Sequence, residues 1–226
     1  MTYELFIGDR SFSSWSLRGW LMFAAFDIPL RVTEVGLYAG TMAEDLAAAA
    51  PARLVPAMIT PEGHVVFDTL AMAETLAERH PDAGLWPEDP VARAFARSIT
   101  AEMHSGFAAL RSACPMYLRH AWEGFSPSSD VLADLARLEQ LWSLARERHG
   151  SAGPWLFGRY SLADVFYAPV ATRIATYALP VGPVAAAYVS AHLREPHLRQ
   201  WRAEGQATHY DCLPYQQDLP EAPWPA

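Results

Sequence analysis

Residues 54–76 read LVPAMITPEGHVVFDTLAMAETL, and this stretch combines a β-hairpin with the start of a helix. Two short apolar runs flank residues 60–63, where proline at the second position and glycine at the fourth are typical of a type I turn. Asp68 and Thr69 then stand directly before an apolar run, as helix-capping residues do. The stretch therefore predicts a strand on each side of the turn and a helix at 70–80.

The residues before this stretch supply the other elements of an α/β unit. Four elements are expected there from apolar spacing and β-branched content, namely a strand at 3–7, a helix at 14–26, a strand at 30–35 and a helix at 41–49. Thr41 and Glu44 match a capping box at the start of the last helix. The order of these elements predicts a compact α/β domain on a mixed sheet over residues 1–80.

The pattern changes after residue 80. Residues 81–88 have the composition of a linker, and residues 89–205 show helical periodicity throughout. The expected helices cover 90–121 (bent near Pro115), 130–149, 161–177, 184–192 and 195–203. Residues 206–226 contain four prolines and are expected to be an irregular tail. The predicted fold class is thus an α/β N-terminal domain followed by an all-helical C-terminal domain.

Composition excludes several classes of enzyme. The chain has 226 residues and a formal net charge of −8, and all 17 of its basic residues are arginine. Without lysine it cannot form a Schiff base, and it lacks the lysine of a Walker A loop or of a Ser-x-x-Lys site. The acidic balance argues against a nucleic-acid surface.

Targeting and metal signals are also weak. No apolar run approaches the roughly 18 residues of a membrane span, and residues 1–4 do not begin a signal peptide. Cys114 and Cys212 are too far apart for a C-x-x-C motif, and the eight histidines form no H-x-x-x-H pair. We therefore expect a cytoplasmic protein with no metal and no membrane or nucleic-acid partner.

Three segments carry polar groups or exposed backbone to the edges of the predicted sheet. They are residues 11–18 after the first strand, Val55-Pro56 before the third strand, and Asp68-Thr69 at the following helix. Each has an ordinary explanation alone, because serine and aspartate commonly cap helices. Their order and spacing together match the arrangement of motifs in one known protein family.

The chain resembles the cytosolic glutathione S-transferases. The matching residues are 13–16 (SSWS), 55–56 (VP), 67–76 (FDTLAMAETL) and, in the helical region, 158–164 (GRYSLAD). The serine-rich stretch is similar to the serine-type classes, nearest to zeta-like bacterial members. The resemblance implies a thioredoxin-like N-terminal domain, a helical C-terminal bundle, and glutathione as co-substrate.

It also implies a hydroxyl that stabilises the glutathione thiolate at a helix N-terminus. Such a donor acts through a charge-assisted hydrogen bond and the helix dipole, and it does not itself attack. Ser13 is the first choice, since it matches the first position of the Cys-x-x-Cys-like turn of thioredoxin-like folds. Ser14 and Ser11 are the alternatives.

Further residues are implied for the tripeptide itself. The backbone of Val55, before a cis Pro56, would pair with the cysteinyl residue. Thr69 suits the γ-glutamyl carboxylate and Asp68 the γ-glutamyl ammonium, although relatives more often have Glu-Ser here. Arg53 is a candidate for the glycyl carboxylate.

The second substrate is expected between the serine loop and the first bundle helices. The candidate lining residues are Phe12, Met103, Phe107, Arg111 and Tyr117, of which 103, 107 and 111 would share one helix face. Ordinary packing between the domains is an equal alternative for these side chains. In contrast, Ser161 and Asp164 match a capping box and are expected to serve folding.

The resulting hypothesis is a glutathione S-transferase that adds the thiolate to a small electrophile, as in detoxification. The alternatives are a glutathione-dependent cis-trans isomerase of the maleylacetoacetate type and a non-catalytic glutathione-binding protein. Members of this family are commonly homodimers, so a homodimer is expected.

Overall fold

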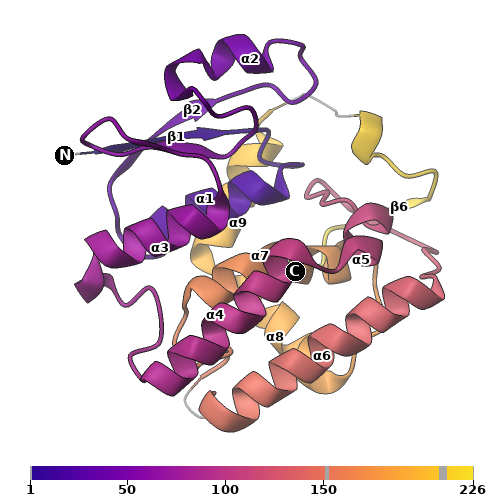
Figure 1. The fold of residues 1–226 in the computed structure, drawn as a ribbon. Coiled ribbons are helices and arrows are strands. Elements are labelled where there is room, and N and C mark those ends of the chain that lie inside the picture. The colour runs from indigo at the N-terminus through magenta and orange to yellow at the C-terminus, as the bar shows by residue number, and fades with distance from the viewer. Residues whose placement is uncertain (1, 151–152, 209–212, 226) are drawn as a thin grey trace.

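A four-stranded mixed sheet forms the first part of the chain (Figure 1). The computed structural model describes residues 2–150, 153–208 and 213–225. The strands are β1 (Tyr3–Ile7), β2 (Leu30–Glu34), β3 (Ala57–Ile59) and β4 (Val65–Val66), in the order β2-β1-β3-β4. β1 and β2 are parallel and the other pairs are antiparallel, so the predicted mixed sheet and hairpin are confirmed.

Helices cover both faces of this sheet. They are α1 (Ser14–Ala24), α3 (Thr69–Arg79) and, on the opposite face, the short α2 (Met42–Asp45) with a 3₁₀ turn η1 (Ala47–Ala49) (Figure 1). β1 is central and buried on both sides: Leu5 packs in the large core with α1, whereas Phe6 packs in a small cluster with Leu46 and Ala49. This explains why β1 is almost continuously apolar.

The expected helix at 41–49 is confirmed only in part, and its Thr41–Glu44 capping box is wrong. The Thr41 hydroxyl donates to the Asp45 carboxylate at 2.7 Å and makes no cap hydrogen bond. The α-helix covers a single turn, and the alanines after it close as a 3₁₀ turn. Only Leu46 and Ala49 are buried in this segment, so packing does not favour a longer amphipathic helix.

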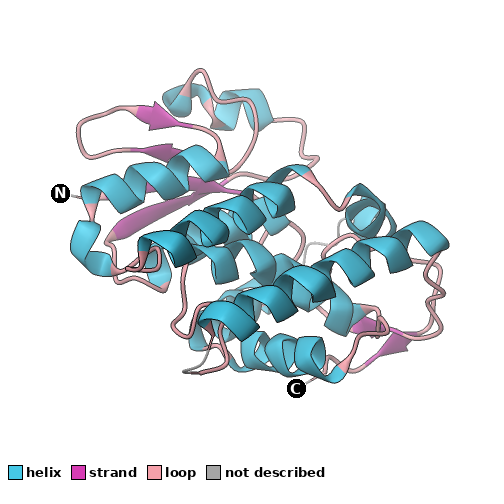
Figure 2. Ribbon diagram, turned by 60° about the horizontal axis from the view of Figure 1, so that its bottom comes forward, coloured by secondary structure: helices cyan, strands magenta, loops and turns pink. Residues whose placement is uncertain are grey.

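The second part of the chain is mainly helical (Figure 2). After the 3₁₀ turn η2 (Pro81–Ala83), its elements are α4 (Pro90–Ser105), α5 (Ala108–Ala113), β5 (Ala121–Trp122), α6 (Ser129–His149), α7 (Leu162–Thr176), α8 (Pro183–Arg194), α9 (Pro196–Gln206), the 3₁₀ turn η3 (Leu213–Tyr215) and β6 (Glu221–Ala222). Among the described helices, none has both the length and the apolar character needed to cross a membrane.

The predicted helix at 90–121 is wrong, because the chain leaves α4 after Ser105. Gly106 is extended, and a Cβ at this position would lie 2.7 Å from the Glu102 carbonyl oxygen. Phe107 then takes a left-handed conformation with φ of 56° before α5 begins. Periodicity alone missed this break because apolar residues continue on both sides of it.

The tail prediction is also partly wrong. Residues 221–222 form β6, which pairs antiparallel with β5, so this segment is not irregular. Residues 209–212 and 226 of the expected tail lie outside the described residues.

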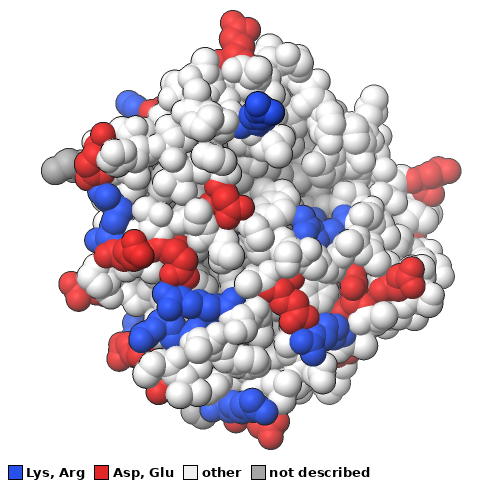
Figure 3. Space-filling view, in the orientation of Figure 1, with Lys and Arg blue, Asp and Glu red and all other residues white. Residues whose placement is uncertain are grey.

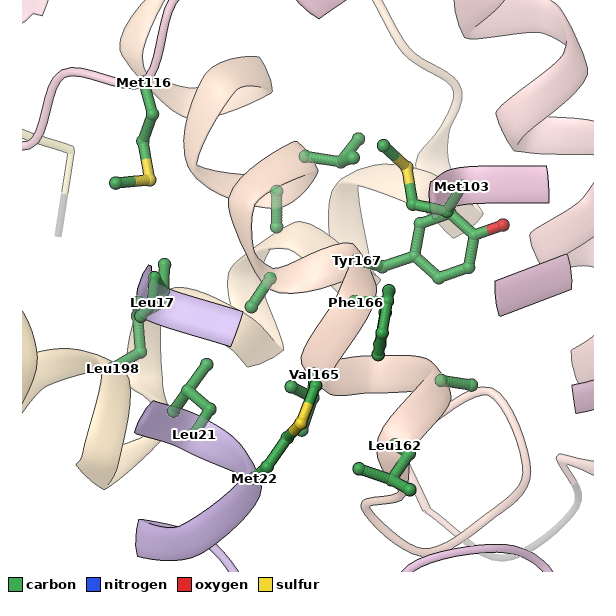
Figure 4. Close-up of a cluster of buried hydrophobic side chains, with 14 of the residues drawn as sticks. Leu17, Leu21, Met22, Met103, Met116, Leu162, Val165, Phe166, Tyr167 and Leu198 are labelled. Atoms are coloured by element: carbon green, nitrogen blue, oxygen red, sulfur yellow. The ribbon is translucent and has the colours of Figure 1, made fainter. Parts of the chain in front are cut away.

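α1 and α7 join the two parts of the molecule. Met22 of α1 lies beside Val165 of α7, and Leu17 and Leu21 belong to the same continuous apolar core (Figure 4). α7 is almost wholly buried, in keeping with its apolar sequence LADVFYAPVATRIAT. A charged residue in this helix therefore needs a specific partner.

The predicted capping box at the start of α7 is confirmed. Asp164 accepts from the Ser161 backbone N–H at 2.9 Å and from the Ser161 hydroxyl at 3.0 Å. It also accepts from the Leu156 N–H and, at 2.9 Å, from the Tyr188 hydroxyl of α8. One buried carboxylate thus ties a loop and two helices together.

His192, one turn beyond Tyr188, is expected to make the stability of the fold depend on pH. Neither ring nitrogen of this buried side chain has a hydrogen-bond partner within the described structure, and burial lowers the pKa of His192 from 6.5 to about 3. Below pH 6.5 the unfolded chain therefore takes up a proton that the folded chain does not. We expect this residue to reduce the free energy of unfolding by up to about 1.4 kcal/mol per pH unit as the pH falls toward 3.

Urea unfolding at several pH values checks this expectation. His192→Leu removes the titrating group and should show a weaker loss of stability on acidification than the parent protein. His64→Leu is the control, since His64 is exposed in the hairpin turn. Equal slopes for the parent and His192→Leu would contradict the assignment.

Candidate functional site

The turn between β1 and α1 holds the three candidate serines. The Asp9 carbonyl accepts from the Ser13 N–H at 2.8 Å, and the Gly8 N–H donates to the Ser16 hydroxyl at 2.9 Å. Ser13 is the N-cap of α1 and Ser14 is its first residue. The turn is thus fixed by hydrogen bonds, and it places the serines at the positive end of the helix.

The three hydroxyls have different partners. Ser11 donates to the Gly205 carbonyl at 3.2 Å, and Ser13 donates to the Ser16 oxygen at 2.8 Å. Ser14 instead accepts from Nη2 of Arg173 at 3.3 Å. Because a guanidinium only donates, this bond leaves the Ser14 proton available, whereas the protons of Ser11 and Ser13 are engaged within the fold.

A cleft of about 520 Å³ opens beside Ser14. Residues from α1, α5, α7 and the connecting loops line it: Ser14, Trp15, Tyr38, Ala108, Arg111, Ser112, Pro115, Met116, Arg173, Pro214 and Tyr215. Figure 3 shows basic side chains at the hollow between the sheet-containing part and the helical part. The two charged residues among those that line the cleft are both arginines.

Three arginines gather around this cleft. The guanidinium carbons of Arg18 and Arg111 lie 4.5 and 4.9 Å from the centre of the Trp15 ring, in cation–π contact. Burial, followed by repulsion from Arg111, lowers the pKa of Arg173 from 12.5 to about 10. Burial also lowers the pKa of Arg18, with Arg173 and Arg111 adding to the effect. The cluster remains cationic at neutral pH and favours an anion nearby.

The Val55–Pro56 segment lies against α1. Its peptide bond is cis, and the Pro56 ring is so close to Gly19 that a Cβ there would approach within 3.0 Å. Glycine at this position therefore allows the helix to reach the loop. Arg53 is exposed, two residues before Val55.

Asp68 and Thr69 are linked to the serine turn through His104 of α4. The Thr69 hydroxyl lies 3.4 Å from Nδ1 of His104, and Asp68 lies 3.3 Å from its Nε2. The His104 ring packs edge-on against Trp15, with ring centres 5.2 Å apart. Asp68 also caps α3 by accepting from the Leu70 and Ala71 N–H groups. All three predicted segments therefore meet around α1.

The predicted second-substrate residues do not form one surface. The shared helix face of 103, 107 and 111 does not exist, because α4 ends before Phe107. Phe12, Met103, Phe107 and Tyr117 are buried in the apolar core, and none is among the residues that line the cleft beside Ser14. Arg111 does line this cleft.

Sequence reasoning missed several residues of the cleft. Trp15 lies inside the serine motif, and Tyr215 lies in the segment expected to be an irregular tail. Arg173 had a usable signal, since it is the one charged residue in the second half of an otherwise apolar helix. Within the described residues, no three His, Cys, Asp or Glu side chains gather as a metal site requires.

Residues 12–79 match the family model of the glutathione S-transferase N-terminal domain. The matched residues run from α1 to α3, in the sheet-containing part of the chain. A probable maleylacetoacetate isomerase of Caenorhabditis elegans is 34% identical over 103 residues. That match covers 46% of this chain, and the chain spans about half (47%) of the relative's length.

Solved structures extend the likeness to the helical part. A glutathione transferase homolog from Burkholderia gl BGR1, with bound glutathione, aligns with a TM-score of 0.68 at 19% identity, over 92% of this chain and all of that one. A glutathione transferase Omega 2S from Trametes versicolor, in complex with 2,4-dihydroxybenzophenone, gives 0.69 at 20% identity, over 91% and 95% of the two chains. The predicted fold, a thioredoxin-like domain followed by a helical domain, is therefore confirmed.

Proposed function

We propose that this protein is a glutathione transferase in which Ser14 stabilises the glutathione thiolate. The observation that carries the proposal is the Ser14 hydroxyl, which stands at the N-terminus of α1, borders the cleft and keeps its proton available. Ser13 and Ser11 remain alternatives, but their protons are used by Ser16 and Gly205. The proposal places glutathione in the domain of residues 1–80 and the electrophile toward the helical domain of residues 89–205, with 81–88 as linker.

The chemistry follows from the charge of the cleft. A cysteine thiol has an ordinary pKa of about 8.5, and one charge-assisted hydrogen bond of about 1.5–3 kcal/mol lowers such a pKa by one to two units. The helix dipole and the arginine cluster act in the same direction. The thiol proton passes to solvent, the sulfur forms a bond to the electrophilic carbon, and the leaving group departs with its bonding electrons.

The tripeptide is proposed to lie along the remaining segments. The backbone of Val55 pairs with the cysteinyl residue, and Thr69, at the start of α3, binds the γ-glutamyl carboxylate. Asp68 binds the γ-glutamyl ammonium while it keeps its contact with His104. Arg53 is exposed beside this path and is proposed for the glycyl carboxylate.

A glutathione-dependent cis-trans isomerase is the second candidate. The C. elegans relative is named a probable maleylacetoacetate isomerase, and the charged residues of the cleft, Arg111 and Arg173, suit the carboxylates of such a substrate. In that reaction the thiolate adds to the double bond, the bond rotates, and the thiolate leaves again. Glutathione is therefore regenerated by the isomerase and consumed by the transferase.

Glutathione binding and turnover test the proposal. We expect millimolar glutathione to raise the thermal unfolding midpoint by a few degrees, because it binds the folded state alone. A conjugation assay with an aromatic halide and an isomerisation assay with maleylacetoacetate then separate the two candidates by whether glutathione is consumed. An unchanged unfolding midpoint at millimolar glutathione would contradict both.

The assembly and location are proposals as well. We propose a cytoplasmic homodimer with a detoxifying role. Leu54 and Phe67 are 73% and 55% exposed on either side of the hairpin, and a partner subunit would cover such apolar side chains.

A further inference from the structure

Arg173 lies in α7 of the helical part, yet its guanidinium reaches the first residue of α1. The contact joins positions 159 residues apart in the sequence. Arg173 is 4% exposed, and within the described residues its hydrogen-bond partners are two carbonyls and a hydroxyl, with no acid among them. A buried guanidinium without a carboxylate is costly, so its position calls for a specific reason.

The guanidinium is held rigidly on its inner side. Its Nε donates to the Cys114 carbonyl at 2.8 Å, and its Nη1 donates to the Pro169 carbonyl at 3.1 Å. These two bonds fix the plane of the group, and Nη2 is then directed at the Ser14 oxygen. The planar fork of arginine makes such a three-point arrangement possible, which a lysine ammonium does not reproduce.

The bond from Nη2 constrains the Ser14 hydroxyl. A hydroxyl has one proton and two lone pairs, and a lone pair that accepts from Arg173 forces the O–H bond to point away from the guanidinium. Both residues line the cleft, so the proton is left for a group inside it. Ser13, which lacks this contact, gives its proton to Ser16.

We propose that Arg173 is the positioning residue that orients the Ser14 hydroxyl as a donor into the cleft. The proposal rests on the assignment of Ser14 as the thiolate-stabilising group. It makes the site a product of both domains: the N-terminal domain supplies the hydroxyl and the helical domain sets its direction. Arg173 also brings a positive charge to the thiolate without contacting the sulfur.

The test measures the pKa of the bound glutathione thiol from the ultraviolet absorbance of its thiolate. Direct detection separates this proton from the other groups around the cleft, which are Arg18, Tyr38, His104, Arg111, Cys114, Tyr177 and Tyr215. We expect Arg173→Gln to raise the thiol pKa by about one unit, which lowers the thiolate fraction at neutral pH by up to about tenfold. Arg111→Gln, which removes a charge from the same cleft without touching Ser14, should cause a smaller shift.

A double-mutant cycle distinguishes orientation from a general structural role. In a Ser14→Ala background, Arg173→Gln should shift the thiol pKa by a smaller amount, comparable to that of Arg111→Gln, because the hydroxyl that it orients is absent and only the loss of its charge remains. An equal shift in both backgrounds, or no shift in either, would overturn the proposal. If Arg173→Gln does not fold, Arg173→Lys is compared in the same two backgrounds, and the same outcomes decide.

Measurements on the parent protein distinguish a failure of this inference from a failure of the proposed function. If it binds glutathione with a lowered thiol pKa and the cycle shows no coupling, the inference about Arg173 fails alone. If it does not bind glutathione, the proposed function fails and this inference falls with it.

Discussion

Replacing Ser14 with alanine is expected to lower kcat/KM for conjugation by about 10- to 100-fold while glutathione still binds. The loss corresponds to one charge-assisted hydrogen bond to the thiolate sulfur. Because this bond is strongest when the sulfur is ionised, the thiol pKa should rise and the pH–rate profile should move to higher pH. Steady-state kinetics at several pH values, with calorimetric titration of glutathione, measures both effects.

Ser13→Ala is the matched control, because it removes the neighbouring hydroxyl from the same turn. Ser13 caps α1 through the Ser16 N–H at 3.3 Å, so its loss should cost about 1 kcal/mol of stability. Its effect on the thiol pKa should be small. The reverse pattern, an active Ser14→Ala and an inactive Ser13→Ala, would return the thiolate role to Ser13.

Asp164→Ala is expected to cause the largest loss of stability. The buried carboxylate accepts from two backbone N–H groups and two hydroxyls, at 2.9 to 3.1 Å. Alanine leaves these donors buried without an acceptor, and we expect the free energy of unfolding to fall by about 3–5 kcal/mol. Urea unfolding at neutral pH measures the change.

Asp89→Ala provides the comparison for a simple helix cap. Asp89 caps α4 by accepting from the Ala92 N–H at 2.7 Å, and it is exposed. Its replacement should cost about 1 kcal/mol, since a single donor loses its partner to water. If both variants lose the same stability, the buried network around Asp164 contributes no more than a cap.

Local patterns predicted the sheet and the helices α1 and α3 well. The hairpin turn was recognisable from residues 60–63, and the Thr60 carbonyl does accept from the Gly63 N–H at 2.8 Å. The capping box of Ser161 and Asp164 was recognisable for the same reason: its donors and acceptors are three residues apart. Such features depend on neighbours in sequence, so one sequence contains the information.

The incorrect predictions for the helices at 41–49 and 90–121 share a different cause. At 41–49, the capping pattern was present, but Thr41 bonded to Asp45 instead, because little of this segment is buried. At Phe107 the chain turns into a left-handed conformation in order to pack the ring into the core. In both places tertiary packing outweighed the local preference, which is worth only a few tenths of a kcal/mol to about 1 kcal/mol per residue.

The sequence by itself determined the order of the elements, the serines at the start of α1, and the absence of a lysine amine from any mechanism. Only the tertiary structure decided which serine hydroxyl has its proton available for a ligand. Ser13 bonds to Ser16, three residues away, but the partners of Ser11 and Ser14 are Gly205 and Arg173, which lie 194 and 159 residues away in the sequence. The long-range contact from α7 decides between Ser13 and Ser14 in our proposal. Hydrogen-bond direction depends on such neighbours in space, and the spacing of residues in a sequence does not specify them.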